Sequence, residues 1–271
     1  MPPTTFKQLE QAAWLAKAAI YDEVLAALTA QAIAPILDAF GTLRGKHVLD
    51  VACGTGHLTA AAARRGADVE GLDFAATMVA KAVENYPNLR FVEGDAEALP
   101  YADESFDAVT CAFGLLHMEH PDKAIKEIHR VLREGGTLAF TVWCGPDQGG
   151  EFFALIADAI QAHGTMDVPL PPAPPAFHFA DPGVCERVLH AAGFRHLKRA
   201  ALPLVWRGAK PEDVLDLADK GTVRTSMQLR AQTDTARAQI HRELLKAAKR
   251  HRSVDGIALA WPAILVTAVK S

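Results

Sequence analysis

The feature that most constrains the fold is the segment 48–58, VLDVACGTGHL, in which an apolar run leads into a glycine turn and then into a helix-forming stretch. Because a glycine has no Cβ, the backbone of such a turn can approach a ligand closely. In an open α/β sheet, ligands bind beyond the carboxyl ends of the strands. The segment therefore predicts a strand, a turn and a helix around a binding site at the edge of a sheet.

The alternation of strand and helix continues over residues 46–143. Besides the strand at 47–53, apolar runs of strand length occupy 68–73, 89–95, 106–113 and 136–143, and helical periodicity occupies 57–65, 75–86 and 121–133. Strands that alternate with helices of about ten residues form parallel sheets with right-handed crossovers. Pro121 suits the first turn of the last helix, and Gly135-Gly136 suits its C-terminal cap. These patterns predict the α/β class.

The segments on either side of residues 46–143 have a different pattern of expected helices and strands. The first 44 residues are expected to be helical, with a helix over about 22–40 that Pro35 kinks or restarts. Five prolines fall between Pro169 and Pro175, which is typical of an extended connector. The remaining elements are expected as a helix near 151–162, a helix opened by Asp181-Pro182, a strand around 197–206, polar helices over 210–252 and a last strand over 261–269.

Acidic residues end three consecutive strands: Asp50, Asp73 and Asp95. A carboxylate at the second position suits the two hydroxyls of a ribose, so the three together indicate a ligand that contains a nucleoside. A dinucleotide fingerprint requires G-x-G-x-x-G, but Thr59 stands at the third glycine position. An acid at the entry of the turn repels a pyrophosphate and attracts an ammonium group. S-adenosylmethionine is therefore the favoured ligand, and a nicotinamide-dependent oxidoreductase is the weaker alternative.

Four segments, VLDVACGTGHL, GLDFAATMV, VEGDAEALPYADESFDAV and HRVLREGGTLAFTVW, occur in this order within residues 45–145. Together they resemble the class I S-adenosylmethionine-dependent methyltransferases, and most closely the ubiquinone/menaquinone-biosynthesis-like group, methyltransferase type 11. The resemblance implies a Rossmann-like, seven-stranded, mostly parallel sheet with helices on both faces and an antiparallel last strand. It also implies that the inserted segments 164–180 and 207–260 form a mostly helical lid over the substrate.

The resemblance further implies a division of the chain into three regions. Residues 1–44 would be helices that cover the cofactor, and residues 45–146 would be the S-adenosylmethionine-binding core. Residues 147–271 would complete the sheet and carry the substrate lid. The pair Tyr21-Asp22 resembles an N-terminal Tyr-Asp of the group that closes over the cofactor, and Trp14 is a further candidate there.

Within the core, the resemblance implies a role for each matching residue. Asp50, Ala52, Gly54 and Gly56 would line the methionine and ribose of the cofactor, and Asp73 would bind the ribose hydroxyls. The adenine and the sulfonium would be surrounded by the other matching positions, which are Phe74 and Met78 beside the adenine, Asp95 at its amino group, Ala96 at the ring edge, and Phe113 near the sulfonium.

The acceptor side is less well specified. His117, in GLLHMEHP, is a candidate substrate contact and the candidate general base for a hydroxyl or carbon-acid acceptor. His120 is at least as well explained as the cap before Pro121. Trp143, Phe177 and His178 are candidate pocket walls, although buried aromatic residues at sheet ends would explain the first two equally well.

The expected activity is methyl transfer to oxygen, nitrogen or carbon of a small molecule by in-line displacement. An RNA or protein methyltransferase and a non-catalytic S-adenosylmethionine-binding regulator are the alternatives. A net charge of −4 gives no reason to expect a nucleic-acid partner, and four cysteines without metal-ligand spacing give none to expect a metal. With no apolar run of 18 residues and no secretory signal pattern, we expect no membrane span, a cytoplasmic location, and a monomer or homodimer.

Overall fold

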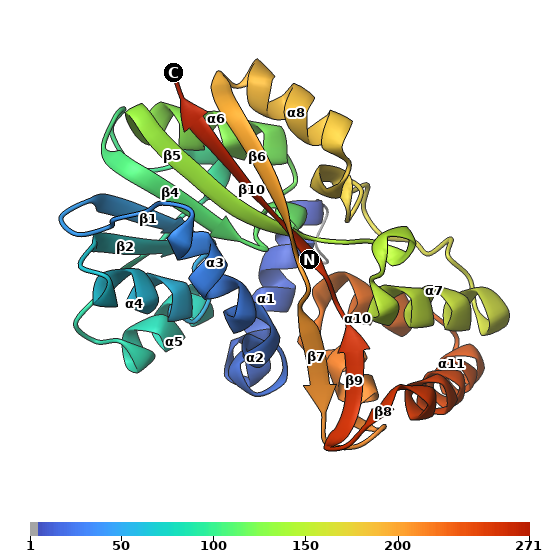
Figure 1. Ribbon diagram of the computed structural model, residues 1–271. Coiled ribbons are helices and arrows are strands. Elements are labelled where there is room, and N and C mark those ends of the chain that lie inside the picture. Colours follow the sequence, from blue (N-terminus) through green and yellow to red (C-terminus); the bar gives the residue numbers. More distant parts are fainter. Residues whose placement is uncertain (1–4) are drawn as a thin grey trace.

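A seven-stranded sheet forms the centre of the computed structural model, which describes residues 5–271 (Figure 1). The strand order is β3-β2-β1-β4-β5-β10-β6. Strand β10 is antiparallel to both of its neighbours, and the other adjacent pairs are parallel. The strands are β1 His47–Val51, β2 Asp68–Asp73, β3 Arg90–Glu93, β4 Phe106–Ala112, β5 Leu132–Trp143, β6 Phe194–Leu202 and β10 Ala263–Lys270. The expected Rossmann-like sheet with an antiparallel last strand is confirmed.

Helices cover both faces of this sheet, because alternate residues of each strand point to opposite sides. Val48 of β1 packs in a core with helices α3 (Ile33–Asp38) and α4 (His57–Arg64), whereas its neighbour Leu49 packs in a second core with α6 (Pro121–Val131) and α8 (Pro182–Ala191). Helix α5 (Ala76–Asn85) follows β2. The glycine turn between β1 and α4 therefore lies between the two helix layers that cover the sheet.

Two local expectations are corrected. Helix α6 starts with Pro121 as expected but ends at Val131, and Gly135-Gly136 lies inside β5, where Gly135 has φ +73 and the pairing with β4 is irregular. The expected helix over 22–40 has an earlier break, although it restarts near Pro35 as expected. It breaks after α1 (Phe6–Val24), continues as α2 (Ala26–Thr29) and a 3-10 turn, and Pro35 lies in the first turn of α3. The first N–H groups of a helix have no intrahelical acceptor, so a proline at this position costs no hydrogen bond.

The second half of the chain adds elements beyond the sheet. The expected strand over 197–206 is two strands, β6 and β7 (Val205–Gly208), and the last strand is preceded by β9 (Gly256–Ala260). Strands β7 and β9, with β8 (Arg252–Ser253), form a separate small sheet. Beside it gather α7 (Glu151–His163), α9 (Asp213–Asp216), a π turn (Leu217–Gly221), α10 (Val223–Arg230) and α11 (Asp234–Ala248) (Figure 1).

The N-terminal region expected over residues 1–44 begins with residues 1–4, which lie outside the described residues. Among residues 5–271, no single helix is long and apolar enough to cross a membrane. The bent pair Phe6–Val24 and Ala26–Asp38 meets the length and composition limits only when its two members are taken together.

Candidate functional site

Two adjoining cavities lie beyond the carboxyl ends of the central strands. The first is bounded by residues that follow β1, β2, β3 and β4 and by helix α1, and its volume is about 830 Å³ with the open mouth included. Nine of the eleven residues expected at a cofactor line it: Tyr21, Ala52, Gly54, Asp73, Phe74, Met78, Asp95, Ala96 and Phe113. The cavity has the position of a nucleotide-type ligand site in an open α/β fold.

The backbone around this cavity is conformationally strained. Ala52 and Phe113 have φ values of 56° and 57°, and Gly54 has 54°. Only glycine adopts this left-handed region without a steric cost, and strained non-glycine residues cluster at functional sites. The strain therefore marks the turns after β1 and β4 as the regions of the cavity whose geometry the fold holds most firmly.

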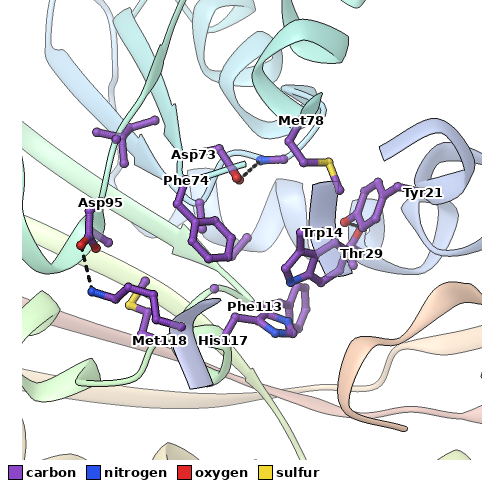
Figure 2. A pocket seen from close by; sticks show the side chains of 18 of the residues that line it. Trp14, Tyr21, Thr29, Asp73, Phe74, Met78, Asp95, Phe113, His117 and Met118 are labelled. Carbon is purple, nitrogen blue, oxygen red and sulfur yellow. Dashed lines mark hydrogen bonds and ion pairs between the residues drawn. The ribbon is translucent and has the colours of Figure 1, made fainter. Parts of the chain in front are cut away.

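Asp73 lies at the end of β2 and is almost fully buried. Its Oδ2 accepts a hydrogen bond from the Gly54 N–H (2.9 Å; Figure 2), and its Oδ1 accepts one from the Ala75 N–H (3.0 Å). Burial raises the pKa of the Asp73 carboxyl, and these backbone hydrogen bonds oppose the rise. The Asp73 carboxylate thus joins the glycine turn to the start of α5, and it keeps further lone pairs for a donor in the cavity.

At the opposite end of the cavity, Asp95 follows β3. Its Oδ2 lies 2.9 Å from the Lys7 ammonium of α1, which also lies 2.7 Å from Glu97 Oε2. Asp95 Oδ1 accepts a hydrogen bond from the Glu97 N–H, which fixes the carboxylate in the turn. Ala96 lines the cavity between these acids. Figure 2 shows Asp95 apart from Asp73, with the phenyl ring of Phe74 below Asp73 in this view.

Helix α1 closes the cavity on its other side. Trp14 and Tyr21 line the cavity, and the Tyr21 hydroxyl lies 3.1 Å from the Thr29 hydroxyl. Burial raises the pKa of Tyr21 to about 12. Asp22 does not line the cavity. It accepts hydrogen bonds from the Thr55 hydroxyl and the Asn85 amide and pairs with His57, and these partners outweigh burial and lower the pKa of Asp22.

Two expected cofactor residues, Asp50 and Gly56, do not line the cavity. The Asp50 side chain points toward α4, where Oδ2 accepts a hydrogen bond from the Thr59 hydroxyl at 2.6 Å, and burial raises the pKa of Asp50 to about 7. Gly56 has φ +87, and a Cβ there would collide with the ring of Phe91. Asp50 thus holds the turn against α4 and Gly56 leaves room for Phe91, and their expected place beside the methionine and ribose stays a prediction.

The second cavity adjoins the first at four shared residues: Trp14, Leu25, His117 and Trp143. Most of its remaining wall is apolar and comes from α7, the segment 164–180 and α10. Trp143 stacks on Phe113 with 3.8 Å between ring centroids, so the end of β5 is packed against the strained turn after β4. His117 and Trp143 line both cavities. A molecule bound in the first cavity and a molecule bound in the second would therefore meet next to these two residues.

The other two expected pocket residues have different positions. Phe177 lines the second cavity and packs edge-on against Phe153 of α7. His178 lines neither cavity, since it begins the 3-10 turn His178–Ala180 and packs edge-on against Phe179. The expectation that His178 is a pocket wall therefore stays a prediction without a cavity contact beside it.

Sequence reasoning missed two charged residues behind His117. Glu10 of α1 is fully buried, with Oε2 2.8 Å from His117 Nδ1, and Arg224 of α10 lies 3.5 Å from Glu10 Oε1. A signal was present, because Phe6, Glu10 and Trp14 are four residues apart and share one helix face. A glutamate within an apolar stripe predicts a buried partner. Among residues 5–271, no group of three His, Cys, Asp or Glu side chains is placed to hold a metal ion.

Comparisons with known proteins agree with this geometry. A family profile described as a methyltransferase domain matches residues 49–140. The demethylmenaquinone methyltransferase of Renibacterium salmoninarum is 44% identical over 114 residues, 42% of this chain and 48% of that protein. That of Beutenbergia cavernae is 38% identical over 171 residues, 59% of this chain and 70% of that protein. The first match thus spans about half the length of the relative.

Among solved structures, phosphoethanolamine N-methyltransferase 2 of Haemonchus contortus shares the fold with a TM-score of 0.54. It was determined with phosphomonomethylethanolamine and S-adenosylhomocysteine bound. The comparison covers 88% of this chain and 52% of that one, at 20% identity.

Proposed function

The chain belongs to the class I S-adenosylmethionine-dependent methyltransferases of the ubiquinone/menaquinone-biosynthesis type, and we propose that it transfers a methyl group from S-adenosylmethionine to a small-molecule acceptor. The observation that carries the proposal is the meeting of the two cavities at Trp14, His117 and Trp143. The first cavity has the acids and the strained turns that suit a nucleoside. The second has the apolar walls that suit an organic acceptor.

The residues of the first cavity fit S-adenosylmethionine. The Asp73 carboxylate would accept from the ribose hydroxyls, and Asp95 would accept from the adenine amino group. Phe74 and Met78 would pack beside the adenine, and the Ala96 backbone would contact its edge. The amino acid end and the sulfonium would lie beside the remaining cavity residues proposed for this ligand, which are Tyr21, Ala52, Gly54 and Phe113.

The ligand supplies an activated methyl group, so the protein needs to bring the acceptor into line with it. Holding two reactants in the correct geometry lowers a barrier by roughly 7–11 kcal/mol. His117 and Trp143 would define the meeting point, and Phe177 would contribute to the acceptor wall. No protein nucleophile is required for a direct displacement.

We propose that helix α1 covers the first cavity and that 164–180 and 207–260 form the lid of the second. Met166, Ala176 and Phe177 from the first lid segment and Thr222–Thr225 from the second line that cavity. Such a lid would exclude water and would select the acceptor by shape. A macromolecular acceptor fits less well, because a base or side chain would have to pass these segments.

A binding assay followed by a turnover assay tests the proposal. Calorimetry with S-adenosylhomocysteine is expected to show one site per chain. Because two relatives are named for demethylmenaquinone, hydroxylated naphthalenes and naphthoquinols are the first acceptors to assay with methyl-labelled cofactor, beside amines and RNA. Binding without transfer to any of these would favour a non-catalytic regulator, and binding of NADH in place of the homocysteine compound would overturn the proposal.

A further inference from the structure

The buried contact between Glu10 and His117 joins two segments that are distant in the sequence. Glu10 Oε2 lies 2.8 Å from His117 Nδ1, and their side chains are 0% and 18% exposed. Glu10 comes from α1, and His117 ends the 3-10 turn Leu115–His117 after β4. His117 lines both cavities and Glu10 lines neither. Glu10 therefore affects a bound molecule through His117.

The contact prepares the His117 ring to accept a proton. An ionised carboxylate only accepts hydrogen bonds, so Nδ1 carries the hydrogen and Nε2 keeps its lone pair in the neutral ring. Within residues 5–271, the His117 ring makes its hydrogen bond through Nδ1 and none through Nε2. The edge-on packing of Trp14, with centroids 4.9 Å apart, restricts rotation of the imidazole. A fixed imidazole with a free Nε2 at the junction of two cavities is the arrangement that a general base requires.

The position of Arg224 offers a simpler account of Glu10, namely that it neutralises this arginine. A buried charge that lacks a partner costs several kcal/mol. Arg224 Nε is 3.5 Å from Glu10 Oε1, yet neither atom makes a hydrogen bond within the described chain. The guanidinium instead donates to the carbonyl oxygens of Pro174 and Leu116. Its main contacts hold the lid and the residue before His117, so the short hydrogen bond of Glu10 is the one to His117.

The residues that line the second cavity indicate which class of acceptor would give its proton to His117. The rings in this cavity wall include Trp143, Phe153, Phe177 and Trp261, and none of the described residues that line it is an aspartate or glutamate. Arg224 also lines it and carries a positive charge. A cationic amine would find no counter-ion there, whereas a flat, uncharged hydroxyl compound would pack against the rings.

We propose that Glu10 is a positioning residue that makes His117 the general base, and that the acceptor is a weakly acidic aromatic hydroxyl compound. The inference rests on the proposed methyltransferase function and specifies it. The acceptor oxygen bonds to the methyl carbon while the carbon–sulfur bond breaks and its electron pair returns to sulfur. The acceptor proton passes to His117 Nε2, and the Glu10 carboxylate faces the imidazolium that forms.

Two acceptors of similar shape test the base directly: 1-naphthol, which is un-ionised at neutral pH, and a nitro-substituted 1-naphthol that is already ionised. General-base catalysis contributes roughly 10²–10⁴-fold. We expect Glu10→Gln and His117→Gln to lower kcat for 1-naphthol by about 100-fold or more, and for the ionised acceptor by less than about 10-fold. Glu10→Asp should restore some of the lost rate.

The matched controls are Glu23→Gln on the exposed side of α1 and His120→Gln three residues after His117. Both should retain wild-type rates with both acceptors. Affinity for S-adenosylhomocysteine should remain within about threefold in the Glu10 variants, since Glu10 does not line the first cavity. An equal loss with both acceptors, or no loss with either, would overturn the assignment of a base.

Because Glu10→Gln leaves Arg224 without its counter-ion, the double variant with Arg224→Gln is also required. We expect it to recover the melting temperature but not the rate with 1-naphthol. Recovery of that rate would show that Glu10 only neutralises Arg224. A wild-type protein that methylates amines but no hydroxyl compound would overturn the acceptor class alone, whereas a protein without S-adenosylhomocysteine binding or any methyl transfer would overturn the proposed function itself.

Discussion

The Asp73 carboxylate accepts the N–H of Gly54, so the end of β2 is hydrogen-bonded to the glycine turn that follows β1. The same carboxylate accepts the N–H of Ala75, which is the N-cap residue of α5. One side chain therefore orders the backbone of the first cavity and faces the position proposed for the ribose. Binding and stability are consequently coupled at Asp73.

This coupling predicts different outcomes for two substitutions. Asp73→Ala removes the acceptor of two backbone N–H groups and should lower the free energy of unfolding by about 1–3 kcal/mol. Asp73→Asn keeps one acceptor oxygen and should be less destabilised, yet it loses the charge and should bind S-adenosylhomocysteine at least about tenfold more weakly. Thermal melts and calorimetry measure the two effects. Unchanged affinity in Asp73→Asn would contradict the ribose assignment.

Lys7 links the first turn of α1 to Asp95 and Glu97 at the other end of the cavity. The Lys7 and Asp95 side chains are about one third exposed or more, but Glu97 is 2% exposed, so Lys7→Met should lower stability mainly by leaving the buried Glu97 carboxylate without its cation. It should also speed the dissociation of S-adenosylhomocysteine, since α1 would open more often. Stopped-flow kinetics and hydrogen exchange over 6–14 test this, with Lys246→Met as the exposed control. A stable α1 with an unchanged dissociation rate would refute it.

Asp50 predicts a pH dependence of stability. Its pKa is raised from 3.8 to about 7 by burial, so between these values the folded chain holds a proton that the unfolded chain has released. Stability then falls as the pH rises from about 4 to about 7. Asp50→Asn keeps an acceptor for Thr59 and does not bind this proton. The melting temperature of the variant minus that of the wild type should therefore rise between pH 5 and pH 8. A difference that is the same at both pH values would show that Asp50 is not protonated when folded.

Gln232 holds the start of the segment 164–180 in place. Its amide accepts from the Thr165 N–H (2.9 Å) and donates to the Thr165 carbonyl oxygen (2.8 Å). Gln232→Ala should release 164–170, raise hydrogen exchange there and raise the KM for the acceptor several-fold. Affinity for S-adenosylhomocysteine should not change, because neither residue lines the first cavity. A matching loss of cofactor affinity would argue against a separate acceptor lid.

Phe177 and His178 form a matched pair of neighbours, since only the first lines the second cavity. Phe177→Ala removes a packed ring from the wall and should raise the acceptor KM about tenfold or more. His178→Ala should leave both KM and kcat within about twofold. Steady-state kinetics with one acceptor decides between them. Equal effects of the two substitutions would mean that the wall is disturbed through the backbone.

The sheet could be predicted because each of its strands is encoded by local signals. Apolar runs of strand length, amphipathic helices between them and Pro121 at a helix start are all read within a few residues. The second sheet could not be found in this way. A short run such as 197–206 looks like one strand, and only pairing with β10 on one side and β9 on the other divides it into β6 and β7.

The candidate site could likewise be predicted from the sequence only in part. Asp73, Asp95 and the glycine turn can be predicted because each lies at the end of a strand, and parallel strands bring their carboxyl ends to one edge. The direction of a side chain is set by its neighbours in space, which is why Asp50 lies against Thr59 and His178 lies outside both cavities.

By itself, the sequence determined the class of fold, the family and the edge of the sheet at which a nucleoside would bind. The fold class and the edge depend on periodicity and on residues within one turn or one strand, and the family rests on the resemblance of four segments. Only the tertiary structure decided that Glu10, His117 and Arg224 meet, because they come from α1, the loop after β4 and α10. A buried carboxylate is stable only beside such partners, and their identity is fixed when distant helices pack against the same sheet edge.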